Sequence, residues 1–184
     1  CRQHGLPDYQ FAKVLLRELG LPGTCGVGFN NIRFDDEFTR QLLYRNFYDP
    51  YEREWKNGNS RWDLLDVLRM ARALRPEGIE WPFDEQGNPT MKLERLTAAN
   101  NIDHAGAHDA LVDVRATIAM ARLLKNSQPR FYDFAFQLRS KKFAGAQLDL
   151  KTHQPLLHTS GKLGGNCLFT SLVMPLMQQP GNNN

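Results

Sequence analysis

Apolar residues recur every three to four positions in several stretches of the chain, the spacing of helices that pack one face on a core. The first such stretch begins at a capping Asp8 and ends before Gly20, with apolar positions at Phe11, Val14, Leu15 and Leu19. The short apolar run 24–29 that follows has the composition of a buried strand. A helix that leads into a buried strand predicts an α/β layered fold.

Polar residues follow this strand, and a second amphipathic helix follows them, with apolar positions at Phe38, Leu42, Leu43 and Phe47. Open α/β sheets bind ligands at such strand ends. The acidic run Asp35, Asp36 and Glu37 lies there. Negative charge at a helix N-terminus is worth roughly a few tenths of a kcal/mol, which accounts for Asp36 and Glu37. Asp35 is nearest the strand end and is the residue that can reach a cleft.

Three further helices are predicted downstream. Asp63 can cap one that runs to Arg75, with core positions at Trp62, Leu64, Leu65, Leu68 and Leu74. A short helix carries Met91, Leu93 and Leu96, and a longer one starts at Leu111. Short strands and turns are expected beyond Pro129, so the predicted domains are residues 1–128 and 129–184.

The start of the longest of these helices carries titratable groups. Its predicted buried stripe is Val114, Ile118, Ala121 and Leu124, and Asp113 lies just off that stripe. A carboxylate in such a seam needs a cation or strong donor, and a divalent metal would serve. His108 can face the same cleft. The alternative is a solvated first turn in which Asp109 complements the helix dipole and His108 is a polar loop residue. The stretch alone leaves both open.

Composition indicates a globular chain that does not span a membrane. Hydrophobic residues make up 41% of the 184 residues and charged residues 23%, and no apolar run approaches the roughly 20 residues of a membrane span. The formal net charge of +3 is too small to indicate a polyanionic partner by itself. Cys1, Cys25 and Cys167 form no close pair, which favours a reducing, cytoplasmic location. Without an initiator Met or a signal-like segment, the sequence is interpreted as a fragment.

Cations and aromatic rings alternate between residues 40 and 75. This mixture is typical of surfaces that stack single-stranded bases and clamp phosphates. Acidic residues in the same stretch dilute its charge, and Trp62 is better interpreted as core. Exposure of Tyr51 and Trp55 would favour DNA binding. Their burial would favour an interaction domain whose basic patch meets an acidic protein tail.

Asp35 at a strand end, together with His108-x4-Asp113 at a helix start, resembles the DEDDh group of DnaQ-like 3′→5′ exonucleases. Longer blocks resemble the bacterial exonuclease I family: GFNNIRFDDE (28–37), YRNFYDPY (44–51), NSRWDLLDV (59–67) and ALRPEGI (73–79). PLLHTSG (155–161) resembles the opening of that family's SH3-like domain. The resemblance implies an α/β, ribonuclease H-like exonuclease fold with a mixed sheet flanked by helices. The fold is N-terminally truncated and is followed by the start of a β-rich SH3-like domain.

The resemblance also implies roles for particular residues. Asp35 and Asp113 would ligate metal, and His108 would be the general base. Phosphodiester hydrolysis by two divalent ions about 4 Å apart needs several carboxylates, and Mg²⁺ suits such oxygen ligands, with Mn²⁺ as an alternative. The family's first motif, Asp-x-Glu, is absent, so the fragment alone is expected to be inactive. The implied contacts to the DNA strand are Arg40, Tyr51, Trp55, Arg69, Arg75 and Lys92.

The function implied by the resemblance is a 3′→5′ exonuclease that degrades single-stranded DNA to mononucleotides by two-metal-ion hydrolysis, in DNA repair and recombination. The implied partners are single-stranded DNA and single-strand DNA-binding protein, with the enzyme a cytoplasmic monomer. The alternative is a non-catalytic module on the same fold that binds single-stranded nucleic acid, in which Asp35, His108 and Asp113 are vestigial.

Overall fold

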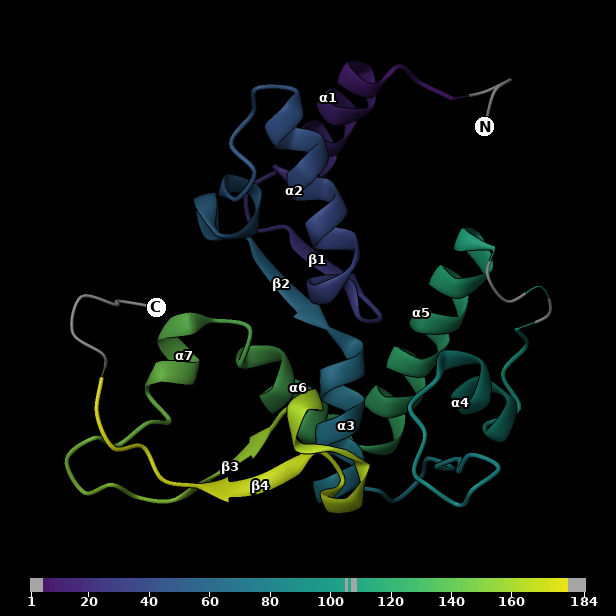
Figure 1. Cartoon of the computed structure of the whole chain (residues 1–184), viewed down its shortest axis with the longest axis vertical. Coiled ribbons are helices and arrows are strands. Elements are labelled where there is room, and N and C mark those ends of the chain that lie inside the picture. Colours follow the sequence, from purple (N-terminus) through teal and green to yellow (C-terminus); the bar gives the residue numbers. More distant parts are fainter. Residues whose placement is uncertain (1–4, 105, 107–108, 179–184) are drawn as a thin grey trace. The chain divides into compact units, whose positions relative to one another are not determined.

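The computed structural model of the chain describes residues 5–104, 106 and 109–178 (Figure 1). The chain divides into two compact units, Cys1–Leu64 and Leu65–Asn184. Each unit has its own secondary structure and its own buried residues, and the two are described in turn.

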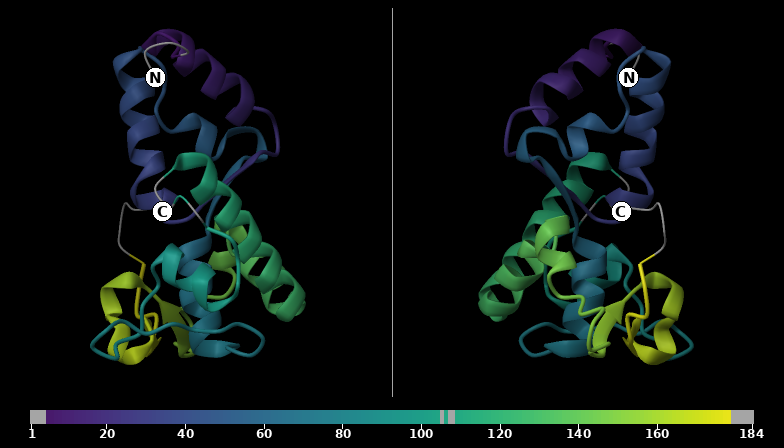
Figure 2. Two further views of the ribbon diagram at one scale, coloured as in Figure 1. Left: turned by 90° about the vertical axis from the view of Figure 1, so that its right-hand side faces the viewer. Right: turned by 90° about the vertical axis from the view of Figure 1, so that its left-hand side faces the viewer.

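The first unit is built around a parallel pair of strands. Its elements are α1 (Asp8–Leu19), β1 (Cys25–Gly28), α2 (Asp35–Arg45) and β2 (Ser60–Asp63), with short 3₁₀ helices at Asn31–Arg33, Glu52–Glu54 and Lys56–Gly58. β1 and β2 run in register from Cys25 opposite Ser60 to Gly28 opposite Asp63. α1 lies beside α2 (Figures 1 and 2), where Ala12, Leu42 and Leu43 form a buried cluster.

The predicted helix, strand and helix over residues 8–45 are confirmed, whereas β2 was not predicted. Two details are wrong: Asp8 is the first residue of α1 and its side chain bonds Arg45 instead of capping the helix, and Phe47 is exposed beyond the end of α2. The sequence of β2, SRWD, contains one apolar residue, so neither alternation nor an apolar run indicates a strand. Asp63, predicted as a helix cap, ends β2 at the point where α3 begins.

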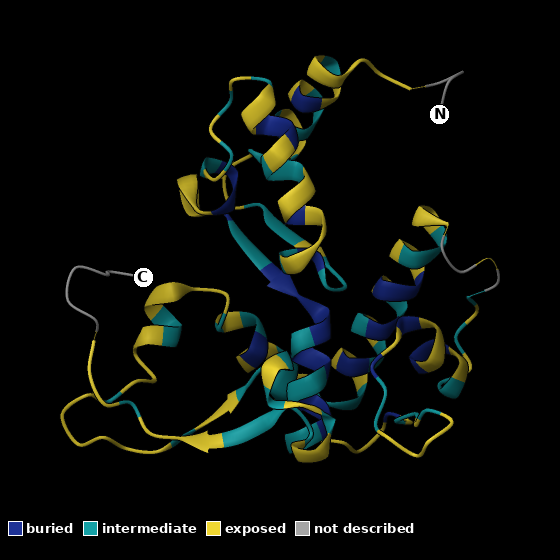
Figure 3. Ribbon diagram, in the orientation of Figure 1, coloured by how far each residue is buried: buried dark blue, intermediate teal, exposed yellow. Residues whose placement is uncertain are grey.

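The second unit is mostly helical and also contains a pair of antiparallel strands. Its elements are α3 (Leu64–Leu74), α4 (Leu93–Ala99), α5 (Ala110–Ser127), α6 (Pro129–Gln137), α7 (Lys141–Gly145), β3 (Leu156–Thr159) and β4 (Thr170–Val173). β3 and β4 are antiparallel, with Leu156 opposite Val173. Many of the buried residues of this unit lie on α3, α4 and α5 (Figure 3), and the fully buried ones include Leu68, Leu96, Thr97, Met120 and Leu124.

The predicted buried stripe of α5 is wrong in part. Leu124 is buried, but Val114 and Ile118 are exposed. The buried face is Ala116, Thr117, Met120 and Leu124. The helix carries apolar residues on more than one face, so spacing alone could not select the packed one. Because Asp113 precedes Ala116 and Thr117 by three and four positions, it stands at the head of the buried face.

The prediction of short strands directly after Pro129 is wrong for Pro129–Gln137 and Lys141–Gly145, which form α6 and α7. Pro129 occupies the first turn of α6, where a missing backbone N–H costs nothing. Phe131, Phe134 and Leu138 follow at helical spacing. Short strands and turns begin later, with β3.

Candidate active site

Asp35 is the first residue of α2. The segment between β1 and α2 is hydrogen-bonded to Asp63, the last residue of β2. Asp63 is buried there, and its Oδ1 accepts a hydrogen bond from the Asn30 N–H at 2.8 Å. Its Oδ2 accepts a longer one from the Ile32 N–H at 3.4 Å and lies 3.8 Å from the Arg33 guanidinium. These bonds hold the exposed Asp35 at the carboxyl end of β1, where α/β sheets bind ligands.

The neighbouring Asp36 has a different environment. It lies in the first turn of α2, as predicted, but it is buried and paired with two arginines. Arg53 donates to its Oδ1 at 2.7 Å, and Arg61 lies 3.3 Å from its Oδ2. Glu54 joins the same cluster through Arg61 at 3.1 Å. The interpretation of Asp36 as a helix-end charge is therefore incomplete, because a buried carboxylate requires such cations.

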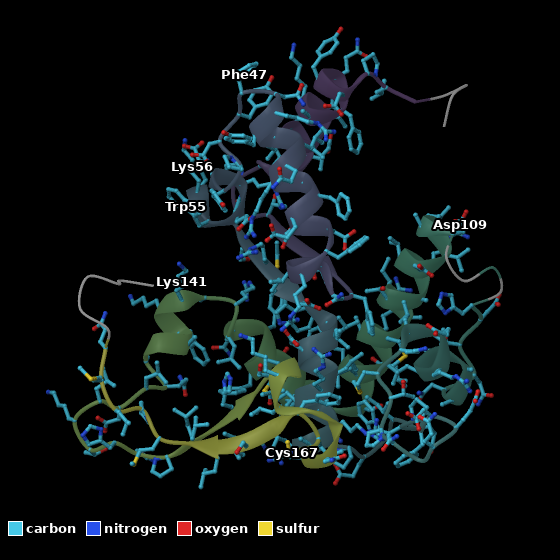
Figure 4. All side chains as sticks on the ribbon, viewed as in Figure 1. Phe47, Trp55, Lys56, Asp109, Lys141 and Cys167 are labelled. Atoms are coloured by element: carbon cyan, nitrogen blue, oxygen red, sulfur yellow. The ribbon has the colours of Figure 1, made fainter. Side chains whose placement is uncertain are left out.

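Asp113 lies in the first turn of α5, and Asp109 caps that helix. The Asp109 carboxylate accepts hydrogen bonds from the Leu111 N–H at 2.9 Å and the Val112 N–H at 3.3 Å. Figure 4 labels Asp109 at the start of the helix. The predicted role of Asp109 at the helix terminus is confirmed, and it leaves the role of Asp113 undecided.

The Asp113 carboxylate is 42% exposed and has a specific partner, His104. Its Oδ1 lies 2.8 Å from His104 Nε2, and His104 Nδ1 lies 3.0 Å from Thr97 Oγ1 on α4. His108, the predicted general base, lies outside the described residues.

The predicted metal ligands lie in different units, Asp35 in the first and Asp113 in the second. Within the part of the chain that the structure describes, no three His, Cys, Asp or Glu side chains are grouped closely enough to hold a metal ion. Asp35 and Asp113 are nevertheless solvent-accessible carboxylates, the oxygen donors that Mg²⁺ prefers. Their chemistry fits the implied metal, and they supply only part of a ligand set.

Of the predicted DNA contacts of the first unit, the two aromatic rings are exposed and Arg40 is largely covered. Trp55 is 64% exposed and Tyr51 is also exposed, and Figure 4 labels Trp55 beside Lys56 at the edge of this unit. The Arg40 guanidinium lies 5.0 Å from the centroid of the Tyr51 ring. Its hydrogen bonds to Glu54, with Nε to Oε1 at 2.8 Å, raise the pKa of Arg40 above its usual value. The Arg40 guanidinium is therefore already paired with a buried carboxylate and lies over an exposed ring.

Three further predicted contacts lie in the second unit. Arg69 donates to Asp66 at 2.7 Å, and its guanidinium lies 5.0 Å from the centroid of the Phe169 ring. Arg75 and Lys92 are exposed. The cations of this unit therefore differ in how readily they could bind a phosphate, since Arg69 already contacts Asp66 and Phe169.

Comparison with known families shows to which family the chain belongs. A family model described as exonuclease, RNase T, matches residues 7–121, which is more than half of the chain. The chain belongs to the RNase T exonuclease family. A second model, the exonuclease I SH3-like domain, matches residues 139–184. Exonucleases of the RNase T family are typically metal-dependent.

Individual proteins and solved structures are also similar to this RNase T exonuclease chain. Exodeoxyribonuclease I of Haemophilus influenzae is 51% identical over 187 residues, covering 100% of the chain and 39% of that protein. The crystal structure of Escherichia coli exonuclease I in complex with a dA16 oligonucleotide is 50% identical, with a TM-score of 0.95 over 100% of the chain and 39% of that structure. A solved ExoI/SSB-Ct complex is 49% identical, with a TM-score of 0.93.

These similarities confirm the predicted resemblance to exonuclease I and the α/β exonuclease fold followed by an SH3-like region. The chain spans 39% of the length of the first relatives it matches.

Sequence reasoning missed the roles of two residues: Asp63, which bonds the segment before Asp35, and His104, which bonds Asp113. Asp63 had a signal, because it is an acidic residue beside a tryptophan in a block that resembles exonuclease I. His104 had none, because nothing in the spacing of a loop residue indicates which helix turn it will contact.

Proposed function

We propose that the chain carries part of the active site of a 3′→5′ exodeoxyribonuclease that degrades single-stranded DNA to mononucleotides in DNA repair and recombination. The observation that carries this proposal is the exonuclease family match over residues 7–121, which contains Asp35, His108 and Asp113. The similarity to a structure solved with a dA16 oligonucleotide supports the substrate class.

In the proposed mechanism, Asp35 and Asp113 hold divalent metal, two Mg²⁺ ions or Mn²⁺ in their place. When bound, such ions lower the pKa of a bound water and neutralise charge on the phosphate. His108 accepts the proton of the attacking water as the general base. Asp35 and Asp113 are two of the about four carboxylates that a two-metal site needs, so the 184-residue chain by itself is expected to be inactive.

The test uses the full-length protein, meaning this chain with all flanking sequence that its gene encodes. Single-stranded DNA labelled at its 5′ end should be shortened from the 3′ end in Mg²⁺. His108→Ala should lower turnover by about a hundredfold or more while DNA affinity is nearly unchanged, since a general base acts in the transition state. His158→Ala, an exposed histidine on β3, is the control. DNA binding without degradation by the unmodified protein would instead favour the non-catalytic module.

We propose that Tyr51 and Trp55 stack DNA bases and that Arg40, Arg69, Arg75 and Lys92 contact phosphates. The exposure of both rings supports this assignment over the interaction domain. Trp55→Ala in the full-length protein should weaken single-stranded DNA binding by about 1–3 kcal/mol, the usual contribution of one stacked base.

A matched control for Trp55 is Phe47→Ala, which removes another exposed aromatic ring from the same unit (Figure 4). Binding isotherms measured at several salt concentrations should show weaker affinity for Trp55→Ala alone, with affinity falling steeply as salt rises for every variant. Equal DNA affinities of the two variants would show that Trp55 does not stack on the DNA.

The proposed protein partner is a single-strand DNA-binding protein, since one solved relative is an ExoI/SSB-Ct complex. Among the described residues, no helix has both the length and the apolar character needed to cross a membrane. We propose a monomeric enzyme that acts in the cytoplasm.

A further inference from the structure

His104 connects the candidate metal ligand Asp113 to the buried part of the second unit. Its side chain is only 8% exposed, whereas that of Asp113 is 42% exposed. Both ring nitrogens of His104 are within hydrogen-bond distance of a partner, Nε2 of Asp113 Oδ1 and Nδ1 of Thr97 Oγ1. The imidazole ring therefore has one orientation that satisfies both contacts.

The direction of these bonds follows from the chemistry of the groups. An ionised carboxylate only accepts hydrogen bonds, so His104 Nε2 carries the hydrogen and donates to Asp113. Thr97 is fully buried on α4, and its Oγ1 also lies 3.0 Å from the Leu93 carbonyl oxygen. Thr97 thus anchors the far side of the ring to a rigid helix.

The geometry points to His104 as a positioning residue for metal binding, an inference that rests on the proposed function. The Nε2–H bond restricts rotation of the Asp113 carboxylate about its side-chain torsion. His104 is held by α4, while Asp113 lies on α5. The bond between them therefore also fixes the position of the carboxylate relative to α4. His104 need not touch the metal, the water or the DNA to have this effect.

Carboxylates that ligate metals are usually held by hydrogen bonds of this kind, and loss of such a partner costs about 10–100-fold in metal affinity or activity. A histidine that only bridges two helices would behave differently. Its loss would lower stability and leave the affinity for metal unchanged. Metal affinity therefore separates the two roles.

The test measures Mn²⁺ affinity by electron paramagnetic resonance on the full-length protein, together with the melting temperature and the turnover of single-stranded DNA. His104→Phe keeps a planar aromatic ring and removes the donor, and it should weaken Mn²⁺ binding about 10–100-fold. His104→Gln places an amide N–H near the Nε2 position and should restore most of the affinity. His104→Asn is too short to reach Asp113 and should not.

Asp113→Asn provides the reference for this series. If Asp113→Asn leaves Mn²⁺ affinity unchanged, the proposed metal site itself is wrong. If Asp113→Asn loses Mn²⁺ and the His104→Gln and His104→Asn variants bind it equally well, the positioning role alone is overturned. Should His104→Phe fail to fold, the comparison of Gln with Asn decides the inference. In the double variant with Asp113→Asn, His104→Phe should add no further loss of Mn²⁺ affinity.

Discussion

Replacing Asp113 with asparagine in the full-length protein should lower the rate of single-stranded DNA degradation by about a thousandfold or more. Asparagine keeps the shape of the side chain and one oxygen, but it loses the negative charge that attracts a divalent cation. DNA affinity should change little, because the proposed stacking and phosphate contacts lie on other residues. Initial rates of nucleotide release, measured across a Mg²⁺ titration, provide the readout.

The matched control for this substitution is Asp109→Asn, four residues earlier at the start of the same helix. Asparagine caps helices about as well as aspartate, so the hydrogen bonds to the Leu111 and Val112 N–H groups should survive. Asp109→Asn should therefore retain nearly full activity. Full activity of Asp113→Asn at every Mg²⁺ concentration would contradict its assignment as a metal ligand.

Replacing Asp36 with alanine should destabilise the first unit by about 3–5 kcal/mol. The substitution leaves the buried Arg53 without the carboxylate that it contacts at 2.7 Å, and it removes a partner of Arg61. Removing one partner of a buried pair costs more than the pair contributes, because the remaining charge stays desolvated. Hydrogen exchange of the β1 and β2 amides in the full-length protein measures the loss within this unit.

The control for Asp36 is Asp8→Ala, which breaks an exposed ion pair with Arg45 that has an N···O distance of 2.6 Å. Hydrogen bonds from Arg45, followed by those from Asn46, lower the pKa of Asp8, but the group is open to solvent. Exposed pairs contribute little to stability. Similar amide protection in Asp8→Ala and Asp36→Ala would show that the buried cluster is not what holds the first unit.

The helices before Pro129 and the first strand could be predicted because their signals are local. Gly20 ends α1, and the apolar spacing of residues 38–43 marks α2. The strand β2 could not be predicted from four residues with one apolar side chain, since it exists by pairing with β1 across 35 positions of sequence. The exposed faces of α5 likewise depend on what packs against the helix, which its own spacing does not specify.

The candidate site was predictable only in outline. Asp35 and Asp113 stood out as acidic residues at element ends, but their joint role came from the resemblance to exonuclease I. The burial of Asp36 depends on Arg53 and Arg61, which are 17 and 25 positions away. The contact between His104 and Asp113 depends on how α4 and α5 pack. Such contacts are properties of the folded chain, and no periodicity encodes them.

The most direct test of the proposed metal site is the anomalous scattering of Mn²⁺ in crystals of the full-length protein with a short single-stranded DNA. The proposal predicts that the carboxylate oxygens of Asp35 and of Asp113 each lie within bonding distance of an anomalous peak, at about the 2.0–2.1 Å typical of Mg²⁺-type octahedral sites. Mn²⁺ peaks that contact neither carboxylate, or that contact only one of them with the other turned away from the DNA 3′ end, would contradict it.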